Sequence, residues 1–229
     1  MSPIASRALA GAAALGLGYA LIGGTSSLAE SVVHAPAPAV TLPATATSET
    51  AVFAGGCFWG VQGVFQHVKG VTSAVSGYTG GNLRGPSYER VSEGDTGHAE
   101  AVKVVFDPRV VSYADLLRVY FSVVADPTQL NAQGPDVGTQ YRSALFPTNE
   151  RQLKVAQAYI GQLKGAKLWQ KPIVTRIERA QPFYTAEGYH QDYLTLHPDS
   201  GYIRYNDAPK VAALKKLFPT LYRAGFIKG

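Results

Sequence analysis

The stretch Ala51-Val52-Phe53-Ala54-Gly55-Gly56-Cys57-Phe58-Trp59-Gly60 decides how the folded part of the chain begins. Its apolar start predicts a short strand over 51–54, and the residues after the cysteine predict a helix over 58–68. Cys57 would then lie at a helix amino terminus, where free N–H groups and the helix dipole stabilise a thiolate and lower the thiol pKa. The flanking glycines let a ligand approach the backbone, so the stretch predicts a reactive cysteine. The alternative is a buried structural cysteine.

Further along the chain, strand-type and helix-type patterns alternate, which is typical of a mixed α/β or α+β layer fold. Two long loops rich in Gly, Pro and Asn, over 79–97 and 126–139, are expected to carry function. The other predicted strands cover 71–78, 100–106, 141–146 and 173–179, and the other predicted helices cover 112–124, 149–163 and 186–196.

The composition sets limits on the class of protein. With 46% hydrophobic and 16% charged residues, the chain can build a large core and is not intrinsically disordered. The net charge of +5 is spread along the sequence, so it indicates no nucleic-acid partner. Cys57 is the one cysteine, which excludes an internal disulfide and a thiolate metal cluster.

The amino-terminal region has the pattern of a processing segment. Arg7 precedes an apolar run over 8–24 and then Ser27-Leu28-Ala29, which predicts a signal peptide over 1–29 and export, with the periplasm as the expected compartment. No integral membrane domain is expected after cleavage; the alternative is an anchor through an uncleaved segment. We expect an extended, mobile Pro/Ala/Thr linker over 30–49, a catalytic domain over 50–205 and a basic helical tail over 206–229. That tail is expected to expose a solvated face, with partner docking as the alternative.

Five motifs occur in one order along the predicted domain: Gly55-Gly56-Cys57-Phe58-Trp59-Gly60, Gly77-Tyr78-Thr79-Gly80-Gly81, Thr96-Gly97-His98-Ala99-Glu100, Asp126-Pro127-Thr128 and Gln140-Tyr141-Arg142-Ser143. In order and spacing they resemble the A-type peptide methionine sulfoxide reductases, over about residues 52–202. The resemblance implies an α+β fold: a two-layer, ferredoxin-like α/β sandwich with a mixed sheet, flanking helices and long loops. It also implies reduction of methionine S-sulfoxide in oxidised proteins and peptides and as the free amino acid.

The resemblance assigns four catalytic positions. Cys57 matches the family's attacking thiol, and Glu100 matches the acid that protonates the departing oxygen. For that role Glu100 should be neutral in the resting site, which requires an apolar pocket and a raised pKa. Tyr88 and Tyr141 match phenols that hydrogen-bond the sulfoxide oxygen.

Three further residues match the family's substrate site. Phe58 and Trp59 correspond to a pocket for the S-methyl group, where sulfur–aromatic contact favours a thioether-like side chain. Both could equally be core aromatics. Asp136 matches a polar residue that orders the site. No bound cofactor is implied, because sulfur carries the electrons.

The chain departs from the family pattern at the recycling step. Most members carry a further cysteine after a Gly-Tyr pair, but Gly201-Tyr202 is followed here by Ile203. We therefore predict a one-cysteine enzyme whose sulfenic acid is reduced by an external thiol: a thioredoxin-like protein, a glutaredoxin-like protein or a small thiol. Ala125 occupies a position where many members have His, and we assign no functional consequence to this difference.

Three alternative classes remain. A cysteine hydrolase would use His98 as the base for Cys57. The Glu187-x-x-His190 step could contribute to a carboxylate-bridged metal site, but such sites need a second step, so no metal is predicted. A non-catalytic module could recognise oxidised methionine without turning it over.

Overall fold

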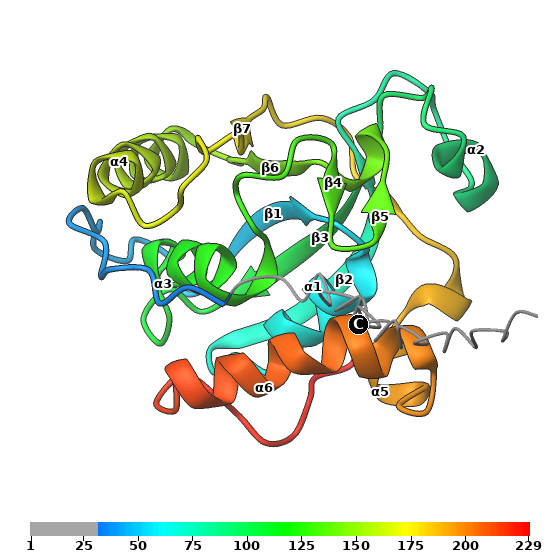
Figure 1. The fold of residues 1–229 in the computed structure, drawn as a ribbon. Helices are drawn as coiled ribbons and strands as arrows, with labels where there is room; N and C mark the ends of the chain where they lie inside the picture. Colours follow the sequence, from blue (N-terminus) through cyan, green and yellow to red (C-terminus); the bar gives the residue numbers. More distant parts are fainter. Residues whose placement is uncertain (1–31) are drawn as a thin grey trace, which may run out of the picture.

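A computed structural model describes residues 32–229, shown as a coloured ribbon in Figure 1. The predicted signal peptide over 1–29 and the first two residues of the predicted linker lie outside these described residues. Within residues 32–229, no helix combines the length and apolar character needed to cross a membrane.

A six-stranded sheet organises the described chain, in the order β7-β6-β1-β3-β2-β8. Strand β1 pairs antiparallel with β3 and β6, β2 pairs antiparallel with β3 and β8, and β6 pairs parallel with β7. The sheet is therefore mixed, and the predicted α+β class with flanking helices is confirmed. The strands are β1 (Glu49–Gly55), β2 (Val71–Thr79), β3 (Ala99–Phe106), β6 (Ser143–Phe146), β7 (Arg176–Ile177) and β8 (Tyr184–Thr185).

The main core lies between the sheet and helices α1 (Phe58–Gln66), α3 (Tyr113–Val119) and α4 (Glu150–Ala166). Phe53 of β1 stacks on Phe65 of α1 and on Tyr120 after α3, with ring centroids 4.8 and 5.7 Å apart. A smaller apolar cluster around Val52 and Phe146 packs against Phe183. Alternate residues of β1 thus reach two apolar clusters, which buries the strand and fixes the position at which it delivers Cys57.

Several predicted elements differ in detail. The helix expected over 112–124 is α3 followed by a π-helical turn, η1 (Tyr120–Val124), which closes with a bond from Ala125 N–H to the Tyr120 carbonyl, 3.1 Å. The strand expected over 173–179 shrinks to the two residues of β7. Instead of one helix over 186–196 there are η3 (Gly188–His190) and α5 (Tyr193–Leu196), separated by Asp192 with φ of +58°.

The two long loops contain short regular elements. The first includes α2 (Tyr88–Ser92), which Ser87 caps by accepting from the Arg90 N–H. The second includes the hairpin of β4 (Ala132–Gln133) and β5 (Asp136–Val137), followed by a 3₁₀ turn, η2 (Thr139–Tyr141). Each element brings one of the predicted site residues to a defined place.

The expectation of a mobile linker without packing partners is wrong for its described part. Ala35 is fully buried, and its N–H donates to the Ser122 hydroxyl, 3.1 Å. The Tyr159 hydroxyl donates to the Pro36 carbonyl, 2.8 Å. Because its Ala and Pro side chains are small, this extended segment lies close against η1 and α4. This close contact replaces the packing that larger side chains would provide.

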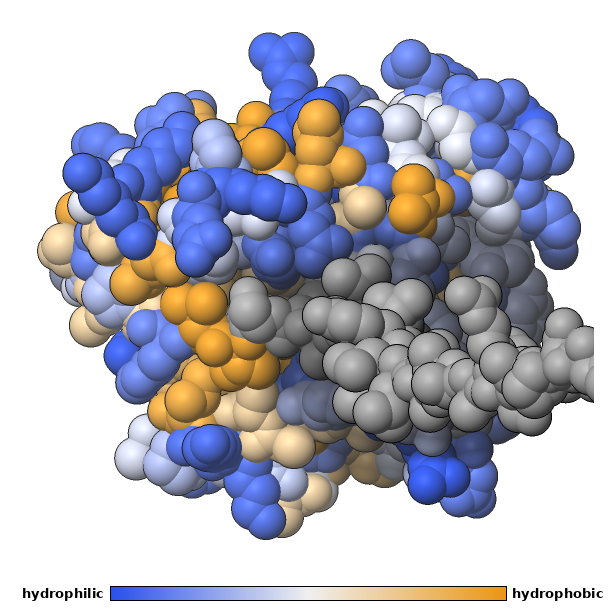
Figure 2. Space-filling view, in the orientation of Figure 1, coloured by the Kyte–Doolittle hydropathy of each residue, from blue (hydrophilic) through white to orange (hydrophobic). Residues whose placement is uncertain are grey.

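The carboxyl-terminal region, predicted as a helical tail with a solvated face, contains a helix that exposes Lys215 and Lys216 but packs its other face on the domain. A π-helical turn, η4 (Ile203–Asp207), continues directly into α6 (Ala208–Leu217), so the predicted boundary at 205/206 falls inside a helical segment. Leu214 is fully buried, and the Lys69 N–H donates to the Leu221 carbonyl, 2.7 Å. On the face shown in Figure 2, apolar side chains gather between α3 and α6, whereas polar side chains dominate over α4.

Candidate active site

Cys57 stands at the junction of β1 and α1, as the first motif predicts, and serves as the residue preceding the helix. The turn requires glycine at 56, because φ there is +87° and an added Cβ would lie 2.5 Å from Gln133 Cβ. Its neighbour Gly55 is packed closely against Ala125 and Tyr120. Gly55 and Gly56 therefore allow the end of β1 to pack closely against η1 and the β4–β5 hairpin.

The first two free amides of α1 serve two different side chains. The Phe58 N–H donates to Glu100 Oε2, 3.0 Å, and the Trp59 N–H favours the thiolate form of Cys57, since it lowers the thiol pKa. A carboxyl from the middle strand and a thiol from the strand-to-helix turn therefore share one helix terminus. This arrangement holds both groups in fixed positions on the same turn of backbone.

The thiol pKa differs from the sequence-based prediction. The pKa of Cys57 is raised well above its usual value, chiefly because burial removes solvation from the thiolate, and also because the charges of Glu100, Asp207 and Asp136 oppose ionisation. The Trp59 N–H acts in the opposite direction and is outweighed. The prediction of a lowered pKa is therefore wrong for the resting site, where the thiol stays protonated.

Glu100 has the property that an acid catalyst would need. The residue is 2% exposed, and burial raises the pKa of its carboxyl from 4.5 to about 8. The Phe58 N–H bond acts against this shift, while the charges of Asp136 and Asp207 add to it. The expected raised pKa is confirmed, and Glu100 is mostly neutral at pH 7.

Tyr88 and Tyr141 come from the two long loops, at the start of α2 and the end of η2. Both lie half-buried, and both phenol pKa values are raised, first by burial and then by the nearby charge of Glu100. The charge of Cys57 adds to the rise at both phenols. The structure thus brings both tyrosines to the Cys57–Glu100 pair as protonated hydrogen-bond donors.

Phe58 and Trp59 are placed differently from each other. Phe58 is buried between Tyr78 and His190, with ring centroids 5.8 and 5.0 Å away. Trp59 is half-buried; it stacks on Tyr193 at 3.8 Å, and its indole N–H donates to His190 Nδ1, 3.2 Å. Phe58 is thus a core aromatic, and Trp59 keeps part of its surface open beside Cys57.

Cys57 also lines a cavity of about 60 Å³. Asp136 lines it, as do Tyr202, which donates a hydrogen bond to the Asp136 carboxylate, and Lys210. The pKa of Asp136 is raised by burial and lowered in part by that bond and by the charge of Lys210. Neither Phe58 nor Trp59 lines this cavity.

Sequence reasoning missed two charged residues of the carboxyl-terminal helical segment. Asp207 and Lys210 are both buried; Lys210 lines the cavity, and the charge of Asp207 affects Cys57, Glu100 and Tyr202. Asp207-Ala208-Pro209 has the Asp and early Pro typical of a helix start. That signal indicates the helix, but not that it packs against the helix following Cys57.

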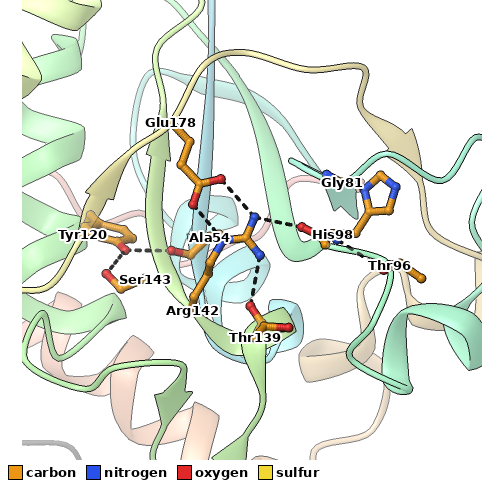
Figure 3. A network of polar contacts seen from close by, with 10 residues as sticks. Ala54, Gly81, Thr96, His98, Tyr120, Thr139, Arg142, Ser143 and Glu178 are labelled. Carbon is orange, nitrogen blue, oxygen red and sulfur yellow. Dashed lines mark hydrogen bonds and ion pairs between the residues drawn. The ribbon is translucent and has the colours of Figure 1, made fainter.

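A polar network behind the site fixes the loops that carry its residues (Figure 3). Arg142 pairs with Glu178, 2.8 Å, and donates to the carbonyls of Thr139 and Gly97, 3.0 and 3.1 Å. The Tyr120 hydroxyl bonds the Ala54 carbonyl and the Ser143 hydroxyl, both at 2.7 Å. Arg142 thereby ties together the segments immediately before Tyr141 and before Glu100.

The residues nominated for other chemistries are engaged elsewhere. His98 Nδ1 accepts from the Gly81 N–H, 3.3 Å, so its Nε2 carries the proton and donates to the Leu83 carbonyl, 2.7 Å. His98 is therefore a structural residue of the first long loop and no base for Cys57. The Glu187 carboxylate accepts from the Tyr78 hydroxyl and the Tyr88 N–H, 2.8 and 2.9 Å. Among residues 32–229, no group of three or more His, Cys, Asp or Glu side chains could hold a metal ion.

A thiol beside a neutral carboxyl and two protonated phenols defines an oxidoreductase-type site that can attack an electrophilic centre and protonate the group leaving it. The model of the family described as "Peptide methionine sulfoxide reductase" matches residues 49–221. The chain belongs to this family and is a peptide-methionine (S)-S-oxide reductase, an enzyme of protein repair.

Individual relatives agree with this assignment. The chain is 65% identical over 175 residues to peptide methionine sulfoxide reductase MsrA 2 of Mesorhizobium japonicum, covering 76% of this chain and 90% of the relative. It is 50% identical over 173 residues to the MsrA of Deinococcus radiodurans, covering 76% and 84%. The reduced form of Mxr1 from Saccharomyces cerevisiae superposes with a TM-score of 0.63 at 32% identity, over 73% of this chain and 96% of that one.

Proposed function

We propose that this enzyme reduces methionine S-sulfoxide through a sulfenic acid on Cys57, which an external thiol then reduces. In the first step the Cys57 sulfur attacks the sulfoxide sulfur while Glu100 protonates the oxygen. The net reaction converts thiol and sulfoxide into sulfenic acid and thioether, so one oxygen atom moves from methionine to Cys57. Tyr88 and Tyr141 hydrogen-bond the oxygen as charge develops on it.

The observation that carries this proposal is the neutral carboxyl of Glu100 beside the thiol. Sulfoxide oxygen is a poor leaving group unless it is protonated, and an ordinary glutamate is ionised at pH 7. Burial raises the pKa of Glu100 to about 8, and the Phe58 N–H holds one carboxyl oxygen in place. Glu100 therefore still carries a transferable proton at pH 7.

The recycling route follows from the sulfur content of the chain. Cys57 is the one cysteine in the sequence, so its sulfenic acid has no partner thiol in the same chain. An external thiol condenses with it to a mixed disulfide and releases water, and a second thiol then releases Cys57 and leaves as the disulfide. We assign this role to a thioredoxin-like protein, a glutaredoxin-like protein or a small thiol.

Mass spectrometry tests the intermediate directly. The enzyme is treated with one equivalent of methionine S-sulfoxide without reductant, and we expect a mass gain of roughly 16 Da, or a dimedone adduct on Cys57. The R-epimer and the Cys57→Ser variant serve as controls and should give neither. Methionine formation with recovery of unmodified thiol would contradict the mechanism. Parallel turnover with dithiothreitol, thioredoxin and glutaredoxin identifies the reductant.

The substrate range follows from the burial of the site. Cys57, Tyr88 and Tyr141 are half-buried and Glu100 is 2% exposed, so a sulfoxide has to reach them on a side chain that projects from its own backbone and not on a folded surface. We therefore propose that exposed, flexible methionine sulfoxides in proteins and peptides are substrates, together with the free amino acid. Relative kcat/KM values for a peptide, an unfolded protein and the free sulfoxide test this range.

Two further assignments belong to the same proposal. We place the enzyme outside the cytoplasm, because Arg7 and the apolar run over 8–24 have the pattern of a secretory signal; cell fractionation and amino-terminal sequencing test it. We also assign the β1-α1-β2-β3-α3-β6 core to the ferredoxin-like type, since its strands lie in the order β6-β1-β3-β2.

A further inference from the structure

Residues 32–39 form an extended stretch, here called the amino-terminal segment, that is hydrogen-bonded to the helical layer. At η1, the Val33 N–H donates to the Ser122 carbonyl, 3.3 Å. At α3, Arg118 Nε donates to the Ala35 carbonyl, 2.9 Å. Together with the bond from the Ala35 N–H to the Ser122 hydroxyl, these contacts fix the main chain at the start of the segment.

The far end of the amino-terminal segment is bonded to α4. The Gln162 side-chain amide donates to the Ala37 carbonyl and accepts from the Ala39 N–H, both at 2.8 Å. The family model matches residues 49–221, so the segment lies outside the matched domain and packs on it. It can therefore add to the active site a feature that the matched domain alone does not supply.

The amino-terminal segment reaches the active site through its first residue. Val32 lines the same cavity as Cys57, and it is 53% exposed, so part of its surface is open to a ligand. Tyr205 of η4 lines this cavity as well and is 77% exposed. Further apolar residues of the cavity wall are Val123, Ala125, Pro135 and Pro209.

The cavity and the proton-donating groups of the site are separate. Glu100, Tyr88 and Tyr141 do not line the cavity. The sulfoxide oxygen has to meet these three groups as it is protonated, so it lies outside the cavity while the sulfoxide sulfur meets Cys57. The cavity therefore receives a different part of the substrate. In a polypeptide, the residue next to the oxidised methionine is the part that lies closest, and the free amino acid has no such residue.

We propose that Val32 is a specificity-determining residue that contacts an apolar side chain next to the oxidised methionine of a polypeptide substrate. This inference rests on the proposed reaction at Cys57 and names a class of substrate: methionine sulfoxides with an apolar neighbour. An apolar side chain that leaves water for this wall binds more tightly than glycine does. Oxidation of a buried methionine disrupts the surrounding core, so apolar segments that carry the sulfoxide become exposed and need repair.

The test compares the wild type with Val32→Asp, which places a carboxylate on the apolar wall. Three blocked, uncharged tripeptides carry methionine S-sulfoxide in the centre, with Gly on both sides, Leu before it or Leu after it. The second-order rate constant of methionine formation is measured without reductant, so that recycling does not contribute. We expect the wild type to prefer at least one Leu peptide over the Gly peptide by about three- to tenfold, and Val32→Asp to bring this ratio close to one.

Two control variants separate the wall from the rest of the segment. Val40→Asp makes the same change at an exposed valine that does not line the cavity, and it should keep the wild-type ratio. Val32→Leu keeps the wall apolar and should also retain a preference for Leu. Thermal unfolding shows whether each variant is folded.

The outcomes distinguish the proposal from its alternatives. A wild type without preference, or a preference that survives in Val32→Asp, would overturn it. A loss with free methionine S-sulfoxide as large as that with the Leu peptides would place the oxidised side chain itself in the cavity, and would also overturn it. So would an effect of Val32→Asp confined to turnover with an external thiol, which would assign the cavity to the reductant. A wild type inactive toward every sulfoxide would instead refute the proposed function.

Discussion

Replacing Glu100 by Gln separates its chemical role from its structural one, because the amide keeps the shape and cannot transfer a proton. With a pKa of about 8 the carboxyl is roughly nine-tenths protonated at pH 7, whereas an ordinary glutamate with a pKa of 4.5 would be protonated about once in 300. Loss of this acid should slow single-turnover methionine formation at least about 100-fold, within the range for general acid catalysis.

The same substitution should have the opposite effect on stability at alkaline pH. Between pH 4.5 and 8 the folded protein retains a proton on Glu100 that the unfolded chain has released, so this residue makes stability fall as pH rises through that window. A shift from 4.5 to about 8 corresponds to up to roughly 5 kcal/mol. Glu100→Gln should remove this slope and be more stable than the wild type at pH 8.

Both effects are measured on one set of samples. Urea unfolding at pH 5, 6.5 and 8 gives the difference in unfolding free energy between variant and wild type, and a stoichiometric assay without reductant gives the chemical step. The exposed Glu150→Gln on α4 is the matched control; it should leave the chemical step unchanged and, because Glu150 lies in the first turn of that helix, lower the unfolding free energy by no more than about 1 kcal/mol, equally at pH 6.5 and 8. A Glu100→Gln enzyme that keeps more than a tenth of the activity, or that loses stability at pH 8, would refute the reasoning.

Three further substitutions test the site and its supports. Tyr141→Phe removes one phenolic donor and should slow single-turnover reduction about ten- to 100-fold without changing the urea midpoint; an unchanged rate would exclude the donor role. Gly56→Ala places a Cβ 2.5 Å from Gln133 Cβ at a φ of +87°, and should cost about 1–3 kcal/mol in urea unfolding; full stability would show that the turn tolerates a side chain. Arg142→Met leaves Glu178 without its cation and releases two loop carbonyls, for a loss of about 3 kcal/mol by the same measurement; a loss under 1 kcal/mol would show that the pair is not needed.

The sequence predicts those parts of the fold that depend on local pattern. Strands β1, β2 and β3 and helices α1 and α4 lie where their apolar periodicity indicates, to within three residues. Elements determined by distant contacts were not predicted. Gln191 bonds the backbone of Ser76 and of Ala186, which interrupts the helix expected over 186–196, and the main-chain bonds of the Ala35 segment to Ser122 leave no trace in its composition.

The residues of the site divide in the same way, into those that a local pattern predicts and those whose place depends on distant contacts. Cys57, Glu100 and Tyr141 each belong to a motif that can be read along the chain, and Tyr88 is assigned by the family resemblance; the structure brings all four to one place. Phe58 has an aromatic side chain suited to a pocket wall, yet the register of α1 directs it into the core. No local signal distinguishes an aromatic residue that lines a cavity from one that fills the interior.

The thiol shows why a local rule fails when tertiary charges are present. The amino terminus of α1 does favour a thiolate, since the Trp59 N–H lowers the pKa of Cys57. Burial of the thiol is the largest cause of the opposite shift, and the charges of Glu100 and Asp207 add to it, so together they outweigh the partial charge of a helix terminus. The sign of the net shift is therefore decided by tertiary packing that no local pattern shows. Burial also keeps Glu100 protonated, and the reduction of a sulfoxide requires that proton as well as a nucleophile.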